Sequence, residues 1–290
     1  MSTPRVVTFG DNVVDCYVGR GEMYPGGNAV NVAAHLSRFG ARAAYCGAVG
    51  DDPAGRHVRD SLRDAGVETT RLRMGGGPTA FCLIGHEEGD RVFLGADLGV
   101  SIIAPEAEDL SAIAQGDAVH TGRSSRIEPH LADLAERARL SYDFAVVRDA
   151  DRIGRIAPLC FLASFSGGDL SDGEAEELAR SAREAGADWV LVTLGGRGAL
   201  LAGPGGMHRA EAVAADLVDT LGAGDTFIAR VLFGLLTEEA PETLLRAAAR
   251  EAAQTCSRYG GFGPAAPIAV DRSRAKSLSE IYSTETTVRA

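Results

Sequence analysis

The stretch Asp219-Thr220-Leu221-Gly222-Ala223-Gly224-Asp225-Thr226-Phe227 follows an apolar and acidic segment, 212–218, and opens a mainly apolar run, 227–236. Its glycines stand where a loop is expected to become a helix, and the first N–H groups of a helix bind anions. Asp225 falls in the first turn. There it can accept the proton of a hydroxyl that attacks a phosphoryl group held by the amides of Gly222, Ala223 and Gly224. An ordinary glycine turn followed by an acid that complements the helix dipole has the same spacing, so both interpretations stay open.

Composition and charge narrow the class of protein. The chain has 290 residues and a net charge of -11, which argues against nucleic-acid and anionic-membrane partners. Its five cysteines are scattered, without the spacing of zinc or redox sites, and are expected to be reduced thiols. No apolar stretch reaches the roughly 20 residues that span a bilayer, and no signal-peptide core follows Met1. We expect a soluble, cytoplasmic protein with no nucleic-acid or membrane partner.

The N-terminal region offers polar side chains beside a predicted strand. Residues 5–10 form an apolar run ending in glycine, and Asp11 and Asp15 follow it. Ligands bind at the carboxyl edge of parallel sheets, so both acids are candidates to accept hydrogen bonds from a polyol; a solvated turn is the alternative. A helix is predicted from a cap at Asn28 to a stop at Gly40, with Asn31 facing the same cleft. His35 within it is expected to be a core or surface residue.

Together these residues carry a resemblance. Gly10-Asp11-Xaa3-Asp15, then Gly26-Gly27-Asn28-Xaa2-Asn31, and the stretch 219–227 some 200 residues later resemble the two signatures of the ribokinase-like (PfkB) carbohydrate kinases, in the same order. The resemblance implies a three-layer α/β/α fold with a mainly parallel central sheet and a small β-sheet lid. It implies ATP and Mg²⁺, with K⁺ as a possible monovalent cation. The partners are then ATP and a small sugar, and a homodimer through the lid is possible.

The resemblance also assigns residues. Catalysis falls to Asp225 with Gly222, Ala223 and Gly224. Substrate binding is expected from Asp11, Asp15, Gly26, Gly27, Asn28, Asn31 and Arg91, although an exposed hairpin arginine is the plainer interpretation of Arg91. Nucleotide binding is expected from Thr193, Gly195, Gly198, Gly222 and Gly224, and Arg197 is a further candidate for a phosphate contact.

The remaining chain alternates short apolar runs with amphipathic segments, as a parallel sheet with helices on both faces requires. Strands are predicted at 117–120, 144–147, 160–163 and 189–194, with helices at 129–140, 171–185, from 223 and at 241–258. We expect a single domain over 1–270, with lid strands from about 13–24 and 78–97. The tail, 271–290, is expected to be peripheral.

Two departures from the family pattern affect the metal site. The family's Asn-Xaa2-Glu motif, which organises the magnesium shell, is missing from 163–169, so no metal ligand is assigned; Asp169, Glu174 or the nucleotide phosphates are candidates to compensate. The Asp-Xaa-Asn-Xaa2-Arg segment survives only as Asp143, with Arg148 a possible replacement for its arginine.

Within the family, the N-terminal motifs and Asp90-Arg91-Val92-Phe93 look most like the fructoselysine 6-kinases. This favours a fructosamine acceptor, a ketose joined to an amino acid. Fructokinase, ribokinase and nucleoside kinase activities are the enzyme alternatives, as is a sugar-binding protein with weak turnover. A dinucleotide oxidoreductase would need Gly-Xaa-Gly-Xaa2-Gly after the first strand, where Asp11 to Asp15 stand instead. The motifs leave the sugar, the hydroxyl, the oligomeric state and the cation requirement open.

Overall fold

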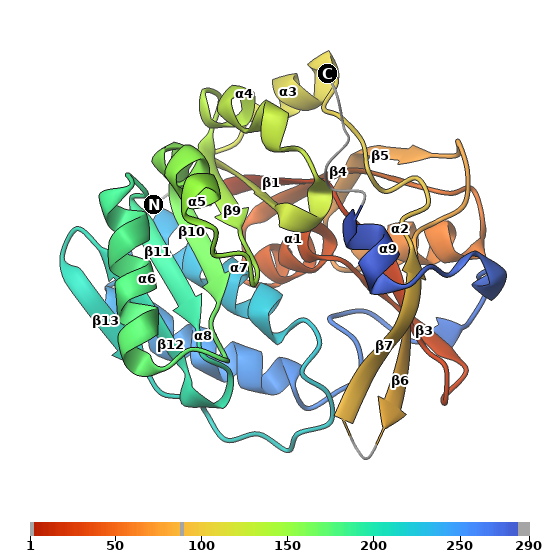
Figure 1. Ribbon diagram of the computed structural model, residues 1–290. Helices are drawn as coiled ribbons and strands as arrows, with labels where there is room; N and C mark the ends of the chain where they lie inside the picture. Colours follow the sequence, from red (N-terminus) through yellow and green to blue (C-terminus); the bar gives the residue numbers. More distant parts are fainter. Residues whose placement is uncertain (1–2, 88–89, 284–290) are drawn as a thin grey trace.

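The computed structural model describes residues 3–87 and 90–283, and it contains two β-sheets (Figure 1). The central sheet has nine strands in the order β13-β12-β11-β10-β9-β8-β1-β4-β5, and it is parallel except at β12 and β13. Its strands are β1 (Arg5–Phe9), β4 (Arg42–Val49), β5 (Glu68–Met74), β8 (Ala118–Gly122), β9 (Arg139–Asp143), β10 (Cys160–Ser166), β11 (Trp189–Thr193), β12 (Ala199–Gly203) and β13 (Gly206–Ala210). The predicted α/β fold with a mainly parallel sheet is therefore confirmed.

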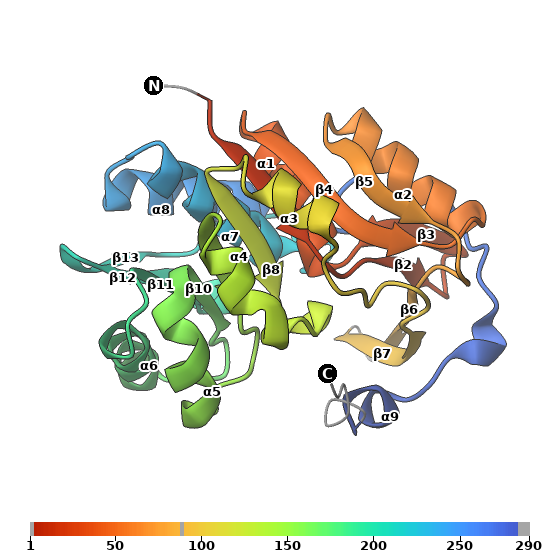
Figure 2. The same cartoon turned by 90° about the horizontal axis from the view of Figure 1, so that it is seen from above.

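Helices cover both faces of this sheet (Figure 2). One face carries α1 (Asn28–Arg38), α2 (Pro53–Asp64), α7 (Ala223–Leu236) and α8 (Pro241–Thr255). The other carries α3 (Ala107–Ile113), α4 (Leu131–Ala135), α5 (Ala150–Ile156) and α6 (Asp172–Glu184). Each helix layer has its own hydrophobic cluster against the sheet, which is how three layers bury the apolar faces of both kinds of element. Within the described residues, no helix is both long and apolar enough to cross a membrane.

The second sheet has the order β14-β3-β2-β6-β7 and matches the predicted lid. Its strands are β2 (Val13–Tyr17), β3 (Glu22–Gly26), β6 (Phe81–Glu87), β7 (Asp90–Asp97) and β14 (Ala266–Pro267). Because β2 follows β1 after three residues, the chain passes from the central sheet into the lid at Asp11 and Asn12. The lid hydroxyl of Tyr17 donates to Asp219 in the loop before α7, which ties the lid to the other half of the molecule.

Segments after residue 270 complete the lid. Ala96 of β7 forms an antiparallel bridge with Lys276, and the short helix α9 (Leu278–Ser283) packs on β7. Ile281 is buried, and its carbonyl accepts a hydrogen bond from Arg126 on the central domain. These residues of the tail therefore contact both the lid and the central domain.

Predictions for the segment 129–147 were wrong in detail. The expected helix over 129–140 is only a 3₁₀ turn, Glu128–His130, followed by α4, and the expected strand over 144–147 lies earlier, at β9. Leu140 and Tyr142 are buried in the sheet between β8 and β10, whereas Val146 is 61% exposed. This shift places Asp143 at the carboxyl end of a strand, where ligands bind in such sheets.

Candidate active site

The predicted base and the two predicted asparagines meet where α1 and α7 begin. Asn28 Nδ2 donates to one carboxylate oxygen of Asp225 at 2.8 Å, and Asn31 Nδ2 donates to the other at 2.6 Å. Burial raises the pKa of Asp225 to about 6, while the two amide donors act to lower it. The carboxylate is thus held in place by charge-assisted hydrogen bonds, yet it titrates close to neutral pH.

Asn28 does not cap its helix as predicted. The cap position is Gly27, with φ 99°, and the backbone N–H of Asn28 donates instead to Asp11 Oδ2 at 2.9 Å. A Cβ at residue 27 would lie 2.7 Å from the Cα of Asn12, so only glycine fits there. Since Asp11 satisfies the helix end, the amide of Asn28 is released to face Asp225.

A relay of buried side chains fixes the orientation of this amide. Asn28 Nδ2 donates to the Asp225 carboxylate, so its Oδ1 faces His120 Nε2 at 3.0 Å and must accept from it. The other ring nitrogen of His120 lies 2.9 Å from the hydroxyl of Ser141, which then donates. Burial lowers the pKa of His120 to about 3, so the ring is neutral and carries its proton on Nε2. Neither His120 nor Ser141 was singled out in the sequence.

The second carboxylate on this amide is Asp143, which the sequence showed only as the remnant of a motif. Asn28 Nδ2 donates to Asp143 Oδ2 at 3.1 Å, and the N–H of Ala145 donates to its Oδ1 at 2.9 Å. Burial, with the charges of Asp225 and Asp11, raises the pKa of Asp143 to about 7. Asp143 and Asp225 therefore interact as two buried carboxylates, and the charge of each disfavours ionisation of the other.

The remaining predicted acceptor residues line the same region. Asp11 is buried and accepts from Ser125 Oγ at 2.9 Å, and burial raises its pKa. Asp15 is buried on β2, against Gly26, where a Cβ would overlap its carboxylate at 1.9 Å. The side chain of Arg91 lies outside the described part of the structure, although its backbone belongs to β7. His35 is a core residue, as expected: it is buried, and its Nε2 lies 2.9 Å from the hydroxyl of Thr226.

The predicted anion hole is the start of α7. Gly222 is its N-cap with φ 77°, and a Cβ there would lie 2.6 Å from the Cα of Gly261. Gly224 is exposed, and a Cβ on it would meet nothing within 4 Å, so the packing does not require glycine at this position. The N–H of Ala223 donates to the carbonyl of Thr220 at 3.3 Å, so the helix N-terminus beside Asp225 offers an anion the amides of Gly222 and Gly224 most directly.

The predicted nucleotide loop follows β11. Thr193 ends that strand, Gly195 (φ 58°) begins a 3₁₀ turn, and Gly198 (φ 90°) ends it. A Cβ on Gly198 would lie 1.9 Å from the carbonyl of Ala210, so the loop requires glycine here to pack on β13.

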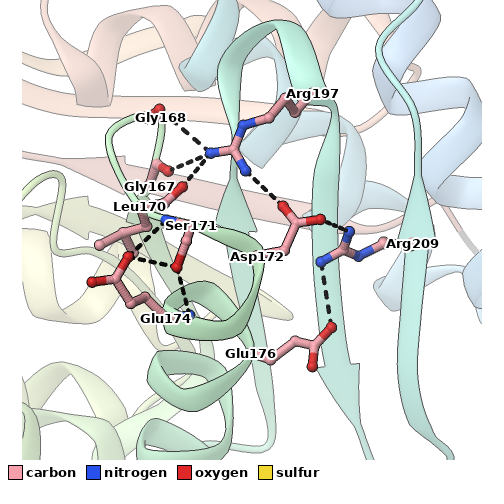
Figure 3. Close-up of polar contacts among 9 residues, drawn as sticks. All are labelled: Gly167, Gly168, Leu170, Ser171, Asp172, Glu174, Glu176, Arg197 and Arg209. Atoms are coloured by element: carbon pink, nitrogen blue, oxygen red, sulfur yellow. Dashed lines mark hydrogen bonds and ion pairs between the residues drawn. The ribbon is translucent and has the colours of Figure 1, made fainter.

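Arg197 of this loop, a candidate for a phosphate contact, is engaged by the protein (Figure 3). Its guanidinium lies 2.6 Å from Asp172 and also donates to the carbonyl of Leu170. Asp172 in turn accepts from Arg209, which reaches Glu176 at 3.4 Å. The cluster joins the loop to the start of α6 and to β13.

The candidates for metal positioning are engaged as well. Asp169 pairs with Arg148, whose hydrogen bonds lower the pKa of that carboxyl to about 2, and Glu174 closes the capping box of α6 with Ser171. The described residues contain no group of three or more His, Cys, Asp or Glu side chains that could hold a metal ion.

A mainly parallel sheet with helices on both faces, an acid beside the N-terminus of α7 and a small second sheet are the arrangement of the ribokinase-like α/β fold. The chain belongs to the pfkB family of carbohydrate kinases, whose family profile matches residues 4–268. It is therefore an ATP-dependent carbohydrate kinase, with a sugar and ATP as its ligands.

Two curated relatives share most of the chain. It is 38% identical to fructosamine kinase FrlD of Bacillus subtilis over 272 residues, which cover 92% of this chain and 96% of the relative. It is 31% identical to the fructoselysine 6-kinase of Escherichia coli, covering 79% and 88%. Among solved structures, Arabidopsis thaliana ribokinase complexed with ribose and ATP superposes with a TM-score of 0.76 at 19% identity, covering 89% and 94% of the two chains, and supports the fold alone.

Proposed function

We propose that the protein transfers the γ-phosphoryl group of ATP to the 6-hydroxyl of a fructosamine. One observation carries the chemistry: the Asp225 carboxylate is fixed by two amides directly beside the exposed N-terminus of α7. The choice of a fructosamine as acceptor is based on the two relatives, because both are named for fructosamine or fructoselysine.

In this proposal Asp225 is the general base. With its pKa at about 6 it is mostly ionised at neutral pH, yet basic enough to take the proton of a primary hydroxyl as that oxygen attacks phosphorus. The amides of Gly222, Ala223 and Gly224 stabilise the charge on the phosphoryl oxygens in flight. Asn28 and Asn31 hold the base, and Asp11 and Asp15 orient the sugar hydroxyls through oxygens that can accept further hydrogen bonds.

The nucleotide is expected on the loop that contains Thr193, Gly195 and Gly198. Since the described side chains form no metal cluster, we expect Mg²⁺ to arrive on the ATP phosphates, and a K⁺ requirement is left for experiment. The lid serves to exclude water, which would otherwise hydrolyse ATP. Exposed Phe93 and Leu94 on β7 support the proposed homodimer through the lid, and the scattered cysteines suit a cytoplasmic enzyme.

ADP release against fructoselysine, fructose, ribose and adenosine tests the acceptor. A fructoselysine kcat/KM at least tenfold above every other acceptor is expected, and a stronger response to fructose or adenosine would refute the assignment. If no acceptor is phosphorylated while fructoselysine still raises the melting temperature, the chain is a sugar-binding protein instead.

The base is tested by Asp225→Asn, with the exposed Asp64→Asn on α2 as the matched control. Loss of a general base is expected to lower kcat by roughly 10² to 10⁴. Near wild-type turnover in a folded Asp225→Asn protein would eliminate the assignment.

A further inference from the structure

Two buried side chains connect α1 to the first turn of α7. They are His35 and Thr226, which are at most 1% exposed. Thr226 Oγ1 lies 2.9 Å from His35 Nε2 and 2.8 Å from the hydroxyl of Thr255 on α8. It also lies 2.9 Å from the carbonyl oxygen of Gly222, the residue that caps α7. One hydroxyl group thus joins three helices at the turn that offers its amides to an anion.

His35 is also bonded to a second backbone segment. Burial lowers the pKa of His35 to about 3, whereas a hydrogen bond with the backbone of Gly261, in the loop after α8, acts to raise it. The ring is therefore neutral near pH 7, with one donor and one acceptor nitrogen. A neutral imidazole can bridge a hydroxyl and a backbone group, and this ring does so between Thr226 and Gly261.

The backbone at Gly222 and Gly261 is packed against the amide that holds the base. A Cβ built on Gly222 would lie 2.6 Å from the Cα of Gly261, and a Cβ built on Gly261 would lie 2.6 Å from Asn31 Oδ1. Asn31 Nδ2 donates to the Asp225 carboxylate at 2.6 Å. A shift of either backbone segment would therefore move the N-terminus of α7 relative to the base.

We propose that His35 and Thr226 are positioning residues for phosphoryl transfer, because they fix the turn at Gly222 relative to the base. The inference rests on the proposed function, in which the start of α7 stabilises the phosphoryl group in flight. Amides stabilise developing charge only where they already point at it, and a misplacement of about 1 Å can cost roughly a hundredfold in rate. Both side chains are buried, so they act through the backbone that they hold.

The kinetic test compares variants that remove these hydrogen-bonding groups with variants that keep them, using the acceptor that is phosphorylated most efficiently in the ADP-release assay. Thr226→Val and His35→Leu should each lower kcat by about 10 to 100 times and leave the KM for the sugar within about twofold of wild type. Thr226→Ser and His35→Gln keep a polar group and should restore most of kcat. Thr237→Val is the matched control, because Thr237 ends the same helix and its hydroxyl donates to the carbonyl of Phe233 at 2.9 Å. Its kcat should equal that of the wild type.

Binding of a transition-state analogue distinguishes positioning from a loss of stability. Aluminium tetrafluoride with ADP and Mg²⁺ mimics the phosphoryl group in flight, and ADP alone lacks that group. In calorimetry with the same acceptor, the wild-type protein is expected to bind ADP more tightly when aluminium fluoride is present. Thr226→Val and His35→Leu should reduce this gain by about tenfold or more and leave the Kd of ADP alone within about twofold of wild type. Thr237→Val should keep the full gain.

The outcomes separate this inference from the proposed function. The inference fails if kcat falls no more in Thr226→Val and His35→Leu than in Thr237→Val, or if both variants keep the full gain from aluminium fluoride; the proposed function then stands without these side chains. If the wild-type protein phosphorylates a sugar but gains nothing from aluminium fluoride, the role proposed for the start of α7 fails, and the inference fails with it. If Thr226→Val does not fold, His35→Leu and His35→Gln decide the inference by the same two measurements.

Discussion

Replacing Asn31 by leucine tests whether the amides set the pKa of the base. The two side chains have nearly the same shape, and Asn31 Oδ1 is buried without a hydrogen-bond partner, so folding is expected to survive. The substitution removes the 2.6 Å bond to Asp225. A hydrogen bond to a charged group contributes about 1.5 to 3 kcal/mol. We take the lower end of this range because Asp225 is partly exposed. One pKa unit corresponds to about 1.4 kcal/mol, so loss of the bond should raise the pKa of Asp225 by about one unit.

The acid limb of the pH profile of kcat/KM reports this pKa in the free enzyme. In the proposed mechanism the base must be ionised, so activity is expected to fall as the pH drops through the pKa of Asp225, about 6 in the wild-type protein. If the pKa of Asp225 rises to about 7, roughly a tenth of the carboxylate is ionised at pH 6 instead of a half. The kcat/KM of Asn31→Leu should then be about fivefold below wild type at pH 6 and equal to it by pH 8.5. Asn31→Asp, which adds a like charge, should move the limb further in the same direction. A lower plateau with the limb unmoved in Asn31→Leu would refute the reasoning.

Three further predictions concern the residues around the base. The pKa of Asp143 in the folded protein is raised from 3.8 to about 7, so the stability that its proton contributes is present at low pH and is lost as the pH rises toward 7. Asp143→Asn should therefore change the pH dependence of the unfolding free energy between pH 5 and 7, by at most about 1.4 kcal/mol per pH unit in urea denaturation. An unchanged slope contradicts the raised pKa. His120→Phe removes the donor to Asn28 Oδ1 and should lower kcat about tenfold, whereas His120→Gln should restore most of the lost activity. Equal kcat values for the wild-type and His120→Phe proteins in steady-state assays would exclude the relay. Gly222→Ala places a Cβ against the Gly261 backbone at a residue with positive φ, and it should lower the melting temperature by about 5 to 10 °C. Gly224→Ala, with open space around its Cβ, should leave the melting temperature unchanged. Equal melting temperatures for the two variants would show that the turn tolerates the side chain.

Local chemistry accounts for what the sequence could predict. Glycine at 40, 66 and 186 stops three helices with positive φ, and the capping box at Ser171 and Glu174 forms as expected. The lid hairpin and the alternation of strands with helices were also predictable, because each depends on residues close together in the chain. Asn28 and Asn31 were expected to hold the acceptor, and their hydrogen bonds to Asp225 were not predicted, since 197 and 194 residues separate them from it.

The rest of the site depends on packing that no short pattern records. His120 and Ser141 look like ordinary strand residues, and they act only because β8 and β9 are neighbours in register. The position of Asp143 at the end of a strand was missed because the strand was predicted at 144–147. The apolar residues there are as compatible with a strand as those of β9. Asn28 resembled a helix cap, but the actual cap comes from Asp11, 17 residues earlier. In each case a tertiary contact overrode a sound local preference.

The dependence of the lid on the residues after 265 has a consequence for synthesis. Four lid strands lie within the first 97 residues, but β14 pairs with β3, and Lys276 bridges Ala96, only after about 180 more residues have been translated. At a translation rate of roughly 5 to 20 residues per second, the edges of this sheet remain unpaired for some 10 to 40 seconds during synthesis. During that time the nascent chain has open strand edges, which are templates for pairing with other chains.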